Sequence, residues 1–329
     1  MLNRQELRQL IHLEYSEADT LHWLGQLTPE AITPALFSDA LACLEETVLP
    51  VALPAMPVMD CCGTGGSGLP HFNTSTTVAF ILAAAGVPVV KFGNRGLSSL
   101  SGSFDLLAQL GFSAPLDLRR IPEGLAHCGL VFLFAPQCYP QLAPFNQLRR
   151  QLKTRTLFNF LGPLLNPVKP AYRLLGVSHP LMQTQMAHYL ASTGVCQRGW
   201  IACGESGLDE LEIAAPTRVF EIQKTHYQEM TIPPFVIETE TENNPALHPI
   251  GPHNPVENEA ILMRLFQNQD QQSPYYQMVC FNAGAGLLIA GKASSLAAGV
   301  QEAKALLRGG KALEKLNECR RFYESFSTR

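Results

Sequence analysis

The stretch Asp60-Cys61-Cys62-Gly63-Thr64-Gly65-Gly66-Ser67-Gly68, which Phe72-Asn73-Thr74-Ser75-Thr76 soon follows, decides our prediction of the fold. Residues 58–62 are a short strand candidate, and the glycines behind them predict a turn that can take up positive φ and approach a ligand closely. Residues 75–85 are apolar and alanine-rich and end at Gly86, which predicts a helix. A strand, a glycine-rich turn and a helix start in this order predict an anion-binding βα unit.

The glycine turn also matches the GxGxxG pattern of dinucleotide-binding folds. That pattern requires an acidic residue at the end of the next strand to bind a ribose hydroxyl, but here residues 87–91 end in Lys91. A P-loop is excluded because no Gly-Lys-Ser/Thr closes the glycine run. The turn therefore indicates anion binding of another kind.

A second turn of similar composition follows one strand later. Gly93-Asn94-Arg95-Gly96 leads through Ser98-Ser99 to Ser101-Gly102-Ser103, just before a helix expected at 104–110. An ordinary Ser/Gly turn would explain one such segment. Two of them on successive βα units, with Lys91 between them, predict a ligand that carries two separate phosphate groups.

The rest of the chain continues the alternation of strands and helices, with helical pieces at both ends. Such alternation predicts an α/β fold with a mostly parallel central sheet. A basic, helical piece at 140–167 interrupts it, and Thr28-Pro29-Glu30 predicts a helix start within the helical residues 1–50. Further strands are expected at 130–134, 173–177 and 200–203. Further helices are expected at 180–193, 257–268 and 280–316, and a loop is expected at 236–258.

An adjacent acidic pair, Asp209-Glu210, follows the strand that ends near Cys203-Gly204. In a loop that begins at glycine, the two carboxylates can converge on one cation. Mg²⁺ suits such hard oxygen ligands, because it binds one or two carboxylates and keeps waters and substrate phosphates as its other ligands. A lone acidic pair is more often a solvated turn, so the phosphate-binding turns upstream are what favour a metal here.

Composition bounds the class of protein. The chain has 329 residues, 46% of them apolar and 16% charged, which predicts a large buried core. The net charge of −4 gives no support to bulk nucleic-acid binding. Nine cysteines without a CxxC pair predict reduced thiols rather than disulfides or a zinc knuckle. The N-terminal MLNRQELRQL lacks signal-peptide features and no apolar run reaches a membrane span, so we expect a cytoplasmic protein that does not enter a membrane.

Several long motifs in fixed order resemble anthranilate phosphoribosyltransferases. They are GTGG, FNTST, KFGNRG and SGSFDLLAQLG within 60–111, the segment KTRTLFNFLGPLLNP at 153–167, and GLDE at 207–210. Glu257-Asn258 and Asn282-Ala283 resemble the C-terminal part of the family. The resemblance implies a small helical domain, 1–56 plus about 141–168, packed on an α/β domain, 57–140 plus 169–329, in a nucleoside phosphorylase/phosphoribosyltransferase-like fold that forms a homodimer.

The same resemblance implies the reaction and the site. Phosphoribosyl pyrophosphate would give its sugar phosphate to anthranilate, a small aromatic amine, in tryptophan biosynthesis. Ser75, Asp209 and Glu210 would hold Mg²⁺, and Lys91, Asn94 and Arg149 would be catalytic, with Arg149 facing the carboxylate of anthranilate. The substrate-binding residues would be Gly63, Gly65, Gly66, Asn73, Ser75, Thr76, Lys91, Asn94, Ser98, Ser99, Ser103, Arg149 and Gly162.

Three positions depart from the family pattern. Ser67 stands where the pattern has Asp, Phe92 where it has His, and Leu100 where it usually has Lys or Arg. The identity of the acceptor is therefore the open question, and a relative that uses another aromatic acceptor, or a pyrimidine-nucleoside phosphorylase, stays an alternative. A further alternative is a non-catalytic relative that binds nucleic acid, which the basic residues between 149 and 155 support.

Overall fold

The structure is a computed structural model, which describes residues 2–69, 72–96, 100–112, 114–235 and 253–327. Its centre is a seven-stranded sheet in the order β3-β2-β1-β4-β5-β6-β7. The first five strands along the chain pair in parallel, and the last two are antiparallel. The strands are β1 (Met59–Gly63), β2 (Val89–Gly93), β3 (Leu130–Phe134), β4 (Tyr172–Gly176), β5 (Arg198–Gly204), β6 (Thr217–Gln223) and β7 (His226–Ile232).

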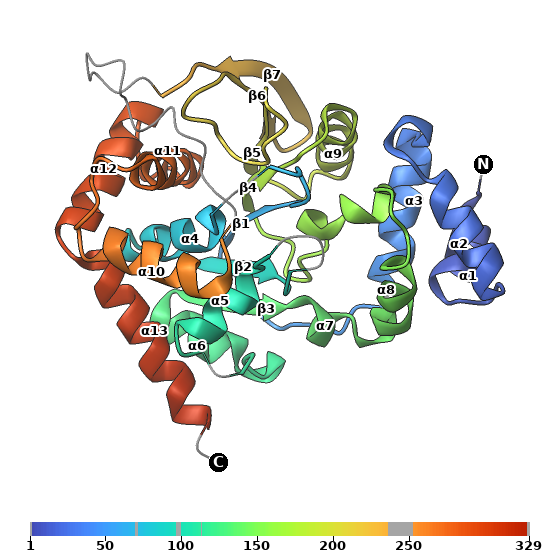
Figure 1. Cartoon of the computed structure of the whole chain (residues 1–329), viewed down its shortest axis with the longest axis horizontal. Helices are drawn as coiled ribbons and strands as arrows, with labels where there is room; N and C mark the ends of the chain where they lie inside the picture. Colours follow the sequence, from blue (N-terminus) through green and yellow to red (C-terminus); the bar gives the residue numbers. More distant parts are fainter. Residues whose placement is uncertain (1, 70–71, 97–99, 113, 236–252, 328–329) are drawn as a thin grey trace.

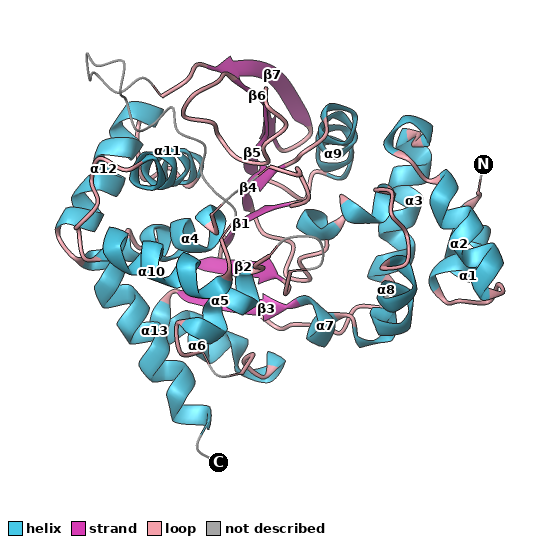
Figure 2. Ribbon diagram, viewed as in Figure 1, coloured by secondary structure: helices cyan, strands magenta, loops and turns pink. Residues whose placement is uncertain are grey.

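Helices cover both faces of this sheet (Figures 1 and 2). One face carries α4 and α11, against which α12 and α13 pack, and α9 lies on the other face over β5 and β6. The helices of this part are α4 (Thr74–Ala84), α5 (Ser103–Gln109), α6 (Ile121–Cys128), α9 (Pro180–Thr193), α10 (Pro255–Phe266), α11 (Pro274–Ile289), α12 (Leu296–Arg308) and α13 (Lys311–Ser327). The predicted α/β class with a mostly parallel sheet is confirmed.

A helical group lies beside the sheet, at the right of Figure 1. It combines the N-terminal helices with a segment from the middle of the chain. The backbone N–H of Leu157 donates to the carbonyl of Leu27 (2.7 Å), and α2 packs on α8. The helices are α1 (Arg4–Ile11), α2 (Glu17–Gln26), α3 (Pro34–Glu45), α7 (Ala135–Cys138) and α8 (Ala143–Arg149). This arrangement agrees with two domains, whose boundaries stay a prediction.

Two local features differ from a simple reading of the sequence. The helix start predicted at Thr28 is present, but only as a single 3₁₀ turn, Pro29–Ala31, without a side-chain cap; α3 begins later, where the Thr33 hydroxyl accepts the N–H of Leu36 (3.2 Å). The hairpin β6–β7 was not predicted. Its turn is Lys224-Thr225 rather than the Asn-Gly type that favours a tight hairpin, and its outer strand is polar and mostly exposed.

The predicted strands and helices of the α/β part are otherwise present within a few residues of their expected ends. The helical stretch expected at 280–316 is divided among α11, α12 and α13, with Gly291 (φ +70°) and Gly310 (φ +69°) at the breaks. All nine cysteines are buried and free. Among the described residues, no helix combines the length and apolar character needed to cross a membrane.

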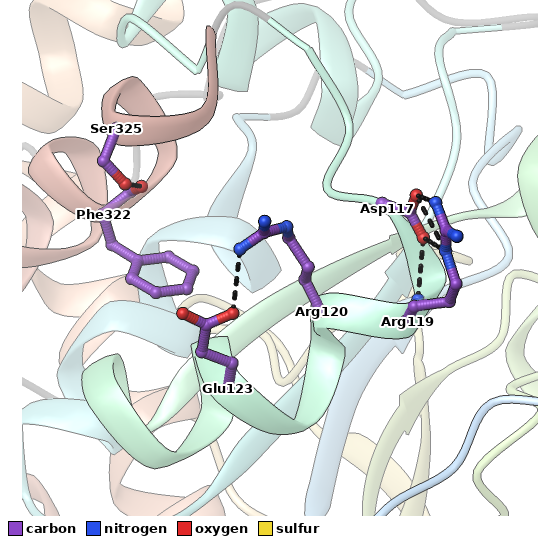
Figure 3. A network of polar contacts seen from close by, with 6 residues as sticks. All are labelled: Asp117, Arg119, Arg120, Glu123, Phe322 and Ser325. Atoms are coloured by element: carbon purple, nitrogen blue, oxygen red, sulfur yellow. Dashed lines mark hydrogen bonds and ion pairs between the residues drawn. The ribbon is translucent and has the colours of Figure 1, made fainter. Parts of the chain in front are cut away.

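A surface network anchors the C-terminal helix beside α6 (Figure 3). Arg120 donates to Glu123 (3.0 Å), and its guanidinium lies 4.0 Å from the ring centroid of Phe326 on α13. Next to it, Arg119 pairs with Asp117 (2.6 Å) and holds the pKa of that carboxyl well below its usual range. These are exposed contacts of structural character, since the residues labelled in Figure 3 are absent from the lining of the cavity described next.

Candidate active site

The carboxyl ends of four neighbouring parallel strands meet at one edge of the sheet. In doubly wound sheets, ligands bind at this edge, where the strand order reverses. Here the reversal lies between β1 and β4, since the chain first adds β2 and β3 on one side and later β4 and β5 on the other. The strands β1, β2, β4 and β5 all end in glycine, at Gly63, Gly93, Gly176 and Gly204. The loops that carry the predicted site residues therefore start side by side.

The first of these loops packs directly against the acidic loop. Gly65 and Gly66 take φ values of +63° and +68°, the left-handed region that favours glycine. The N–H of Gly65 donates to the Asp209 carboxylate (2.7 Å), and a Cβ on Gly63 would collide with the same carboxylate. The glycines thus serve two purposes, since they shape the turn and leave room for Asp209.

The start of α4 points its donors toward the same place. Asn73, the N-cap residue, makes no side-chain cap hydrogen bond, and its own N–H is held by the side chain of Asn258 (3.0 Å). Lys91 is 2% exposed, and its ammonium donates to the carbonyl of Cys61 and to the hydroxyl of Ser75 (3.1 Å). A positive helix end and a fixed ammonium together favour a bound anion.

The second loop is less open than predicted. The Asp105 carboxylate accepts the N–H groups of Gly96 (2.7 Å) and Gly102 (2.8 Å), so these two donors already have an anionic partner within the chain. The hydroxyl of Ser103 donates to the carbonyl of Asn94 (3.2 Å). These two amides are therefore occupied within the chain, while the second phosphate cradle itself stays a prediction. Ser98 and Ser99, its other predicted donors, lie outside the described residues.

In the acidic pair, Asp209 is buried and Glu210 is half-buried. Asp209 is 7% exposed, and burial, followed by the charge of Asp209, raises the pKa of Glu210 well above its usual range. Asn282 holds the loop by accepting the N–H of Leu211 (3.0 Å) and donating to its carbonyl (3.1 Å). Two neighbouring carboxylates that are largely removed from water repel each other and favour a cation between them. They fit Mg²⁺, which needs few protein ligands, whereas no group of three or more His, Cys, Asp or Glu suited to a metal occurs in the described part of the chain.

The opposite end of the site is lined by apolar side chains and by the guanidinium of Arg149. Arg149, at the end of α8, donates to the side chain of Asn146 (2.9 Å) and lies 5.8 and 5.5 Å from the ring centroids of Phe145 and Phe158. Burial lowers the pKa of Arg149 to about 10. In the part of the chain that the structure describes, no Asp or Glu forms an ion pair with it at 4.0 Å or less. A guanidinium in such surroundings can bind a planar carboxylate from a ligand.

Both ends belong to one cavity of about 300 Å³. Its lining includes every described residue that the sequence analysis assigned to the site, namely Gly63, Gly65, Gly66, Asn73, Ser75, Thr76, Lys91, Asn94, Ser103, Arg149, Gly162, Asp209 and Glu210. The helical group contributes Arg149, and the strand ends contribute most of the rest. The structure thus brings these residues together, while their individual roles stay predictions.

Several supporting residues escaped the sequence analysis. Asp60 is fully buried beneath the site, where its carboxylate accepts the N–H of Phe92 (3.2 Å) and the side-chain amide of Asn166 (2.8 Å). Arg155 and Ser178 donate to the carbonyl of Gly65 (3.0 and 2.9 Å). No local sequence pattern predicts the contacts of Arg155 and Ser178 with Gly65, because these residues lie 90 and 113 positions from Gly65 in the chain.

Of the three departures from the family pattern, one reaches the cavity. Phe92 lines it and packs edge-on against Tyr139 (6.1 Å between ring centroids). Leu100 is 66% exposed, and the Ser67 hydroxyl accepts the N–H of Leu69 (3.2 Å); neither residue is part of the lining. The basic segment from 149 to 155 forms no continuous basic face, because Arg149 faces the cavity and Arg155 the glycine turn.

Known proteins resemble this chain over most of its length. Residues 55–313 match the model of the glycosyl transferase family, a/b domain. An anthranilate phosphoribosyltransferase of Desulfitobacterium hafniense (strain DSM 10664 / DCB-2) is 40% identical over 295 residues, which cover 89% of this chain and 84% of the relative. One of Sorangium cellulosum (strain So ce56) is 38% identical over 311 residues, which cover 94% of this chain and 87% of the relative.

Solved structures agree with these sequence matches. The crystal structure of anthranilate phosphoribosyltransferase from Thermus thermophilus has a TM-score of 0.82 and 32% identity, over 98% of this chain and 96% of its own. The Saccharomyces cerevisiae enzyme in complex with PRPP and Mg has a TM-score of 0.81 at 23% identity, over 98% of this chain and 93% of its own, a likeness that concerns the fold.

Proposed function

The chain belongs to the anthranilate phosphoribosyltransferase family, and from this premise we propose how its cavity transfers the phosphoribosyl group of phosphoribosyl pyrophosphate to anthranilate. The products are N-phosphoribosyl-anthranilate and pyrophosphate, and we expect them to belong to tryptophan biosynthesis. The observation that carries the proposal is the composition of the cavity, which has glycine-rich strand ends and the carboxylates of Asp209 and Glu210 on one side and Arg149 among aromatic rings on the other.

The strand-end side binds the activated sugar in this proposal. Gly63, Gly65 and Gly66 let the backbone approach the phosphates, and Asn73, Ser75 and Thr76 at the start of α4 add donors. Asn94 and Ser103 from the second loop line the same cavity, and the family resemblance implies that Ser98 and Ser99 take part as well. Asp209 and Glu210, helped by Ser75, would hold Mg²⁺, which supplies charge neutralisation for the pyrophosphate when bound. This agrees with the yeast relative, which was solved with PRPP and Mg.

The apolar side binds the acceptor. Arg149 meets the carboxylate of anthranilate, while Phe158 and neighbouring apolar side chains face its ring. Asn94 and Gly162 line the space between the two ends. The acceptor is thereby oriented with its amine toward the sugar, which contributes to the rate by positioning.

The chemistry follows from these positions. The bond between the anomeric carbon and the pyrophosphate oxygen breaks through a transition state with oxocarbenium character, and the acceptor nitrogen forms the new bond and then loses a proton. Lys91, fixed by Cys61 and Ser75, stabilises the negative charge of the departing pyrophosphate. An aromatic amine is neutral at pH 7, so the attack needs no strong general base.

The direct test is loss of anthranilate fluorescence after addition of phosphoribosyl pyrophosphate and MgCl₂, with an EDTA-treated sample as the control. We expect signal loss that requires all three components. Persistence of the signal, with binding of neither substrate by calorimetry, would contradict the proposal.

Phe92 gives a reason to include other acceptors in the same assay. It places an aromatic ring rather than a polar group in the cavity wall, next to Tyr139. A panel of ring-substituted anthranilates and a pyrimidine nucleoside would show whether anthranilate is the preferred acceptor. Size-exclusion chromatography would test the homodimer that the family resemblance implies. Cell fractionation of the native host would test the expected cytoplasmic location.

A further inference from the structure

Both backbone polar groups of Gly65 have partners. Its N–H donates to Asp209 (2.7 Å), and its carbonyl accepts the guanidinium of Arg155 (3.0 Å) and the hydroxyls of Ser178 (2.9 Å) and Thr64 (3.2 Å). Asp209 and Ser178 belong to loops at the strand ends, just after β5 and β4. Arg155 comes from the mid-chain segment that follows α8. The hydrogen bond from Arg155 to the Gly65 carbonyl therefore joins that segment to the glycine turn.

Arg155 is placed to hold the turn and not to touch a ligand. Its guanidinium carbon lies 4.2 Å from the ring centroid of Phe160, and a Cβ on Gly66 would come within 3.3 Å of it. Among the described residues, no carboxylate pairs with it at 4.0 Å or less, and it is absent from the cavity lining. Since charge-assisted hydrogen bonds are the stronger kind, this contact fixes the carbonyl more firmly than the neutral hydroxyl of Ser178 does.

The same segment carries the residues of the acceptor side. Arg149 lies six residues before Arg155, and Phe158 and Gly162, which line the cavity, lie shortly after it. The Phe160 ring fixes the plane of the guanidinium from within this segment. A shift of the segment relative to the sheet would therefore move the Gly65 peptide, and the glycine turn with it.

We propose that Arg155 is a positioning residue that sets the phosphate-binding turn through the Gly65 carbonyl and so aligns it with the acceptor side. The inference rests on the proposed function, because it assumes that the turn binds phosphoribosyl pyrophosphate. Arg155 acts on that substrate through Gly65 and makes no contact with the reacting atoms. Its loss should weaken binding of phosphoribosyl pyrophosphate more than it changes the maximal rate.

The test uses Arg155→Ala and Arg155→Lys in the full chain, with Arg150→Ala as the matched control, because Arg150 is an exposed arginine on the same segment. Calorimetry measures binding of phosphoribosyl pyrophosphate with Mg²⁺ and no acceptor. We expect about tenfold weaker binding for Arg155→Ala, the effect of losing one charge-assisted hydrogen bond. Arg155→Lys should recover part of the affinity, since an ammonium can donate to the carbonyl but cannot stack as a plane.

Steady-state kinetics and melting temperatures complete the test. For Arg155→Ala we expect a raised KM for phosphoribosyl pyrophosphate, a kcat within about threefold of the parent, and normal values for Arg150→Ala. The inference is overturned if Arg155→Ala binds the substrate as tightly as the parent, or if its melting temperature falls while affinity and KM stay the same. If the parent itself fails to bind phosphoribosyl pyrophosphate, the proposed function is what fails.

Discussion

Replacing Arg149 by Met should make the protein more stable and the enzyme worse at binding its acceptor. Burial lowers the pKa of Arg149 from its usual value to about 10, so the charged form is disfavoured in the folded protein. At about 1.4 kcal/mol for each pKa unit, this corresponds to ~3 kcal/mol. The hydrogen bond to Asn146 and the two aromatic rings offset ~2 kcal/mol of it. Arg149→Met should therefore raise the free energy of unfolding by ~1 kcal/mol.

The effect on the acceptor has the opposite sign. A carboxylate that faces Met in place of a guanidinium loses a pair of charge-assisted hydrogen bonds, ~3 kcal/mol in all, which corresponds to a rise of about 100-fold in the KM for anthranilate. The KM for phosphoribosyl pyrophosphate should change little, because its proposed site lies at the other end of the cavity. The gain in stability and the loss of affinity have one cause, which is a half-buried charge kept for a ligand.

Urea unfolding followed by tryptophan fluorescence measures the first quantity, and the anthranilate fluorescence assay measures the second. Arg150→Met is the control, since its side chain is exposed and both quantities should stay at the parent values. A fall of more than about 1 kcal/mol in unfolding free energy for Arg149→Met, or an unchanged KM for anthranilate, would refute the reasoning.

Three further predictions concern the support of the site. Asp60→Asn should lower the free energy of unfolding by ~3 kcal/mol in urea titrations, because the NH₂ group of the new amide would face another donor, either the backbone N–H of Phe92 or the side-chain amide of Asn166. Unchanged stability would contradict this. Asp209→Ala combined with Glu210→Ala should abolish Mg²⁺-dependent turnover while circular dichroism stays native, and surviving turnover would disprove the metal assignment. The buried thiols of Cys61, Cys138 and Cys280 should resist a disulfide reagent at pH 8 until urea is added, since burial raises their pKa to about 12; fast labelling of any of the three in the folded protein would count against this burial.

The sequence predicts those parts of the fold whose signals are local. The glycine turn after β1 and the apolar helix α4 are adjacent in the chain, and each carries its own pattern of residues. The hairpin β6–β7 was missed because its turn has no strong signature and its outer strand is polar. The helix start at Thr28 shows a different limit, since a Thr-Pro pair marks where a helix begins but not whether it continues beyond a 3₁₀ turn.

The site residues, too, could be predicted from the sequence only where their signal is local. Residues with a phosphate or metal chemistry of their own, such as Lys91 and Asp209, could be selected from motifs. The contact between Arg155 and Gly65 could not, because it depends on how the mid-chain segment packs against the sheet. Asp105 could have been read correctly, since an acidic residue three positions after Gly102 is a usual capping pattern that consumes nearby N–H groups.

The pairing of Leu27 with Leu157 bears on how the chain emerges from the ribosome. The N-terminal helices leave the exit tunnel first, yet the surface that α2 uses for α8 has no partner until the mid-chain segment has been made. At roughly 5–20 residues per second, the ~130 residues between these two positions take on the order of ten seconds to synthesise. Throughout that delay the surface of α2 that later packs on α8 stays uncovered. We therefore expect chaperones that bind nascent chains at the ribosome to assist the folding of this protein.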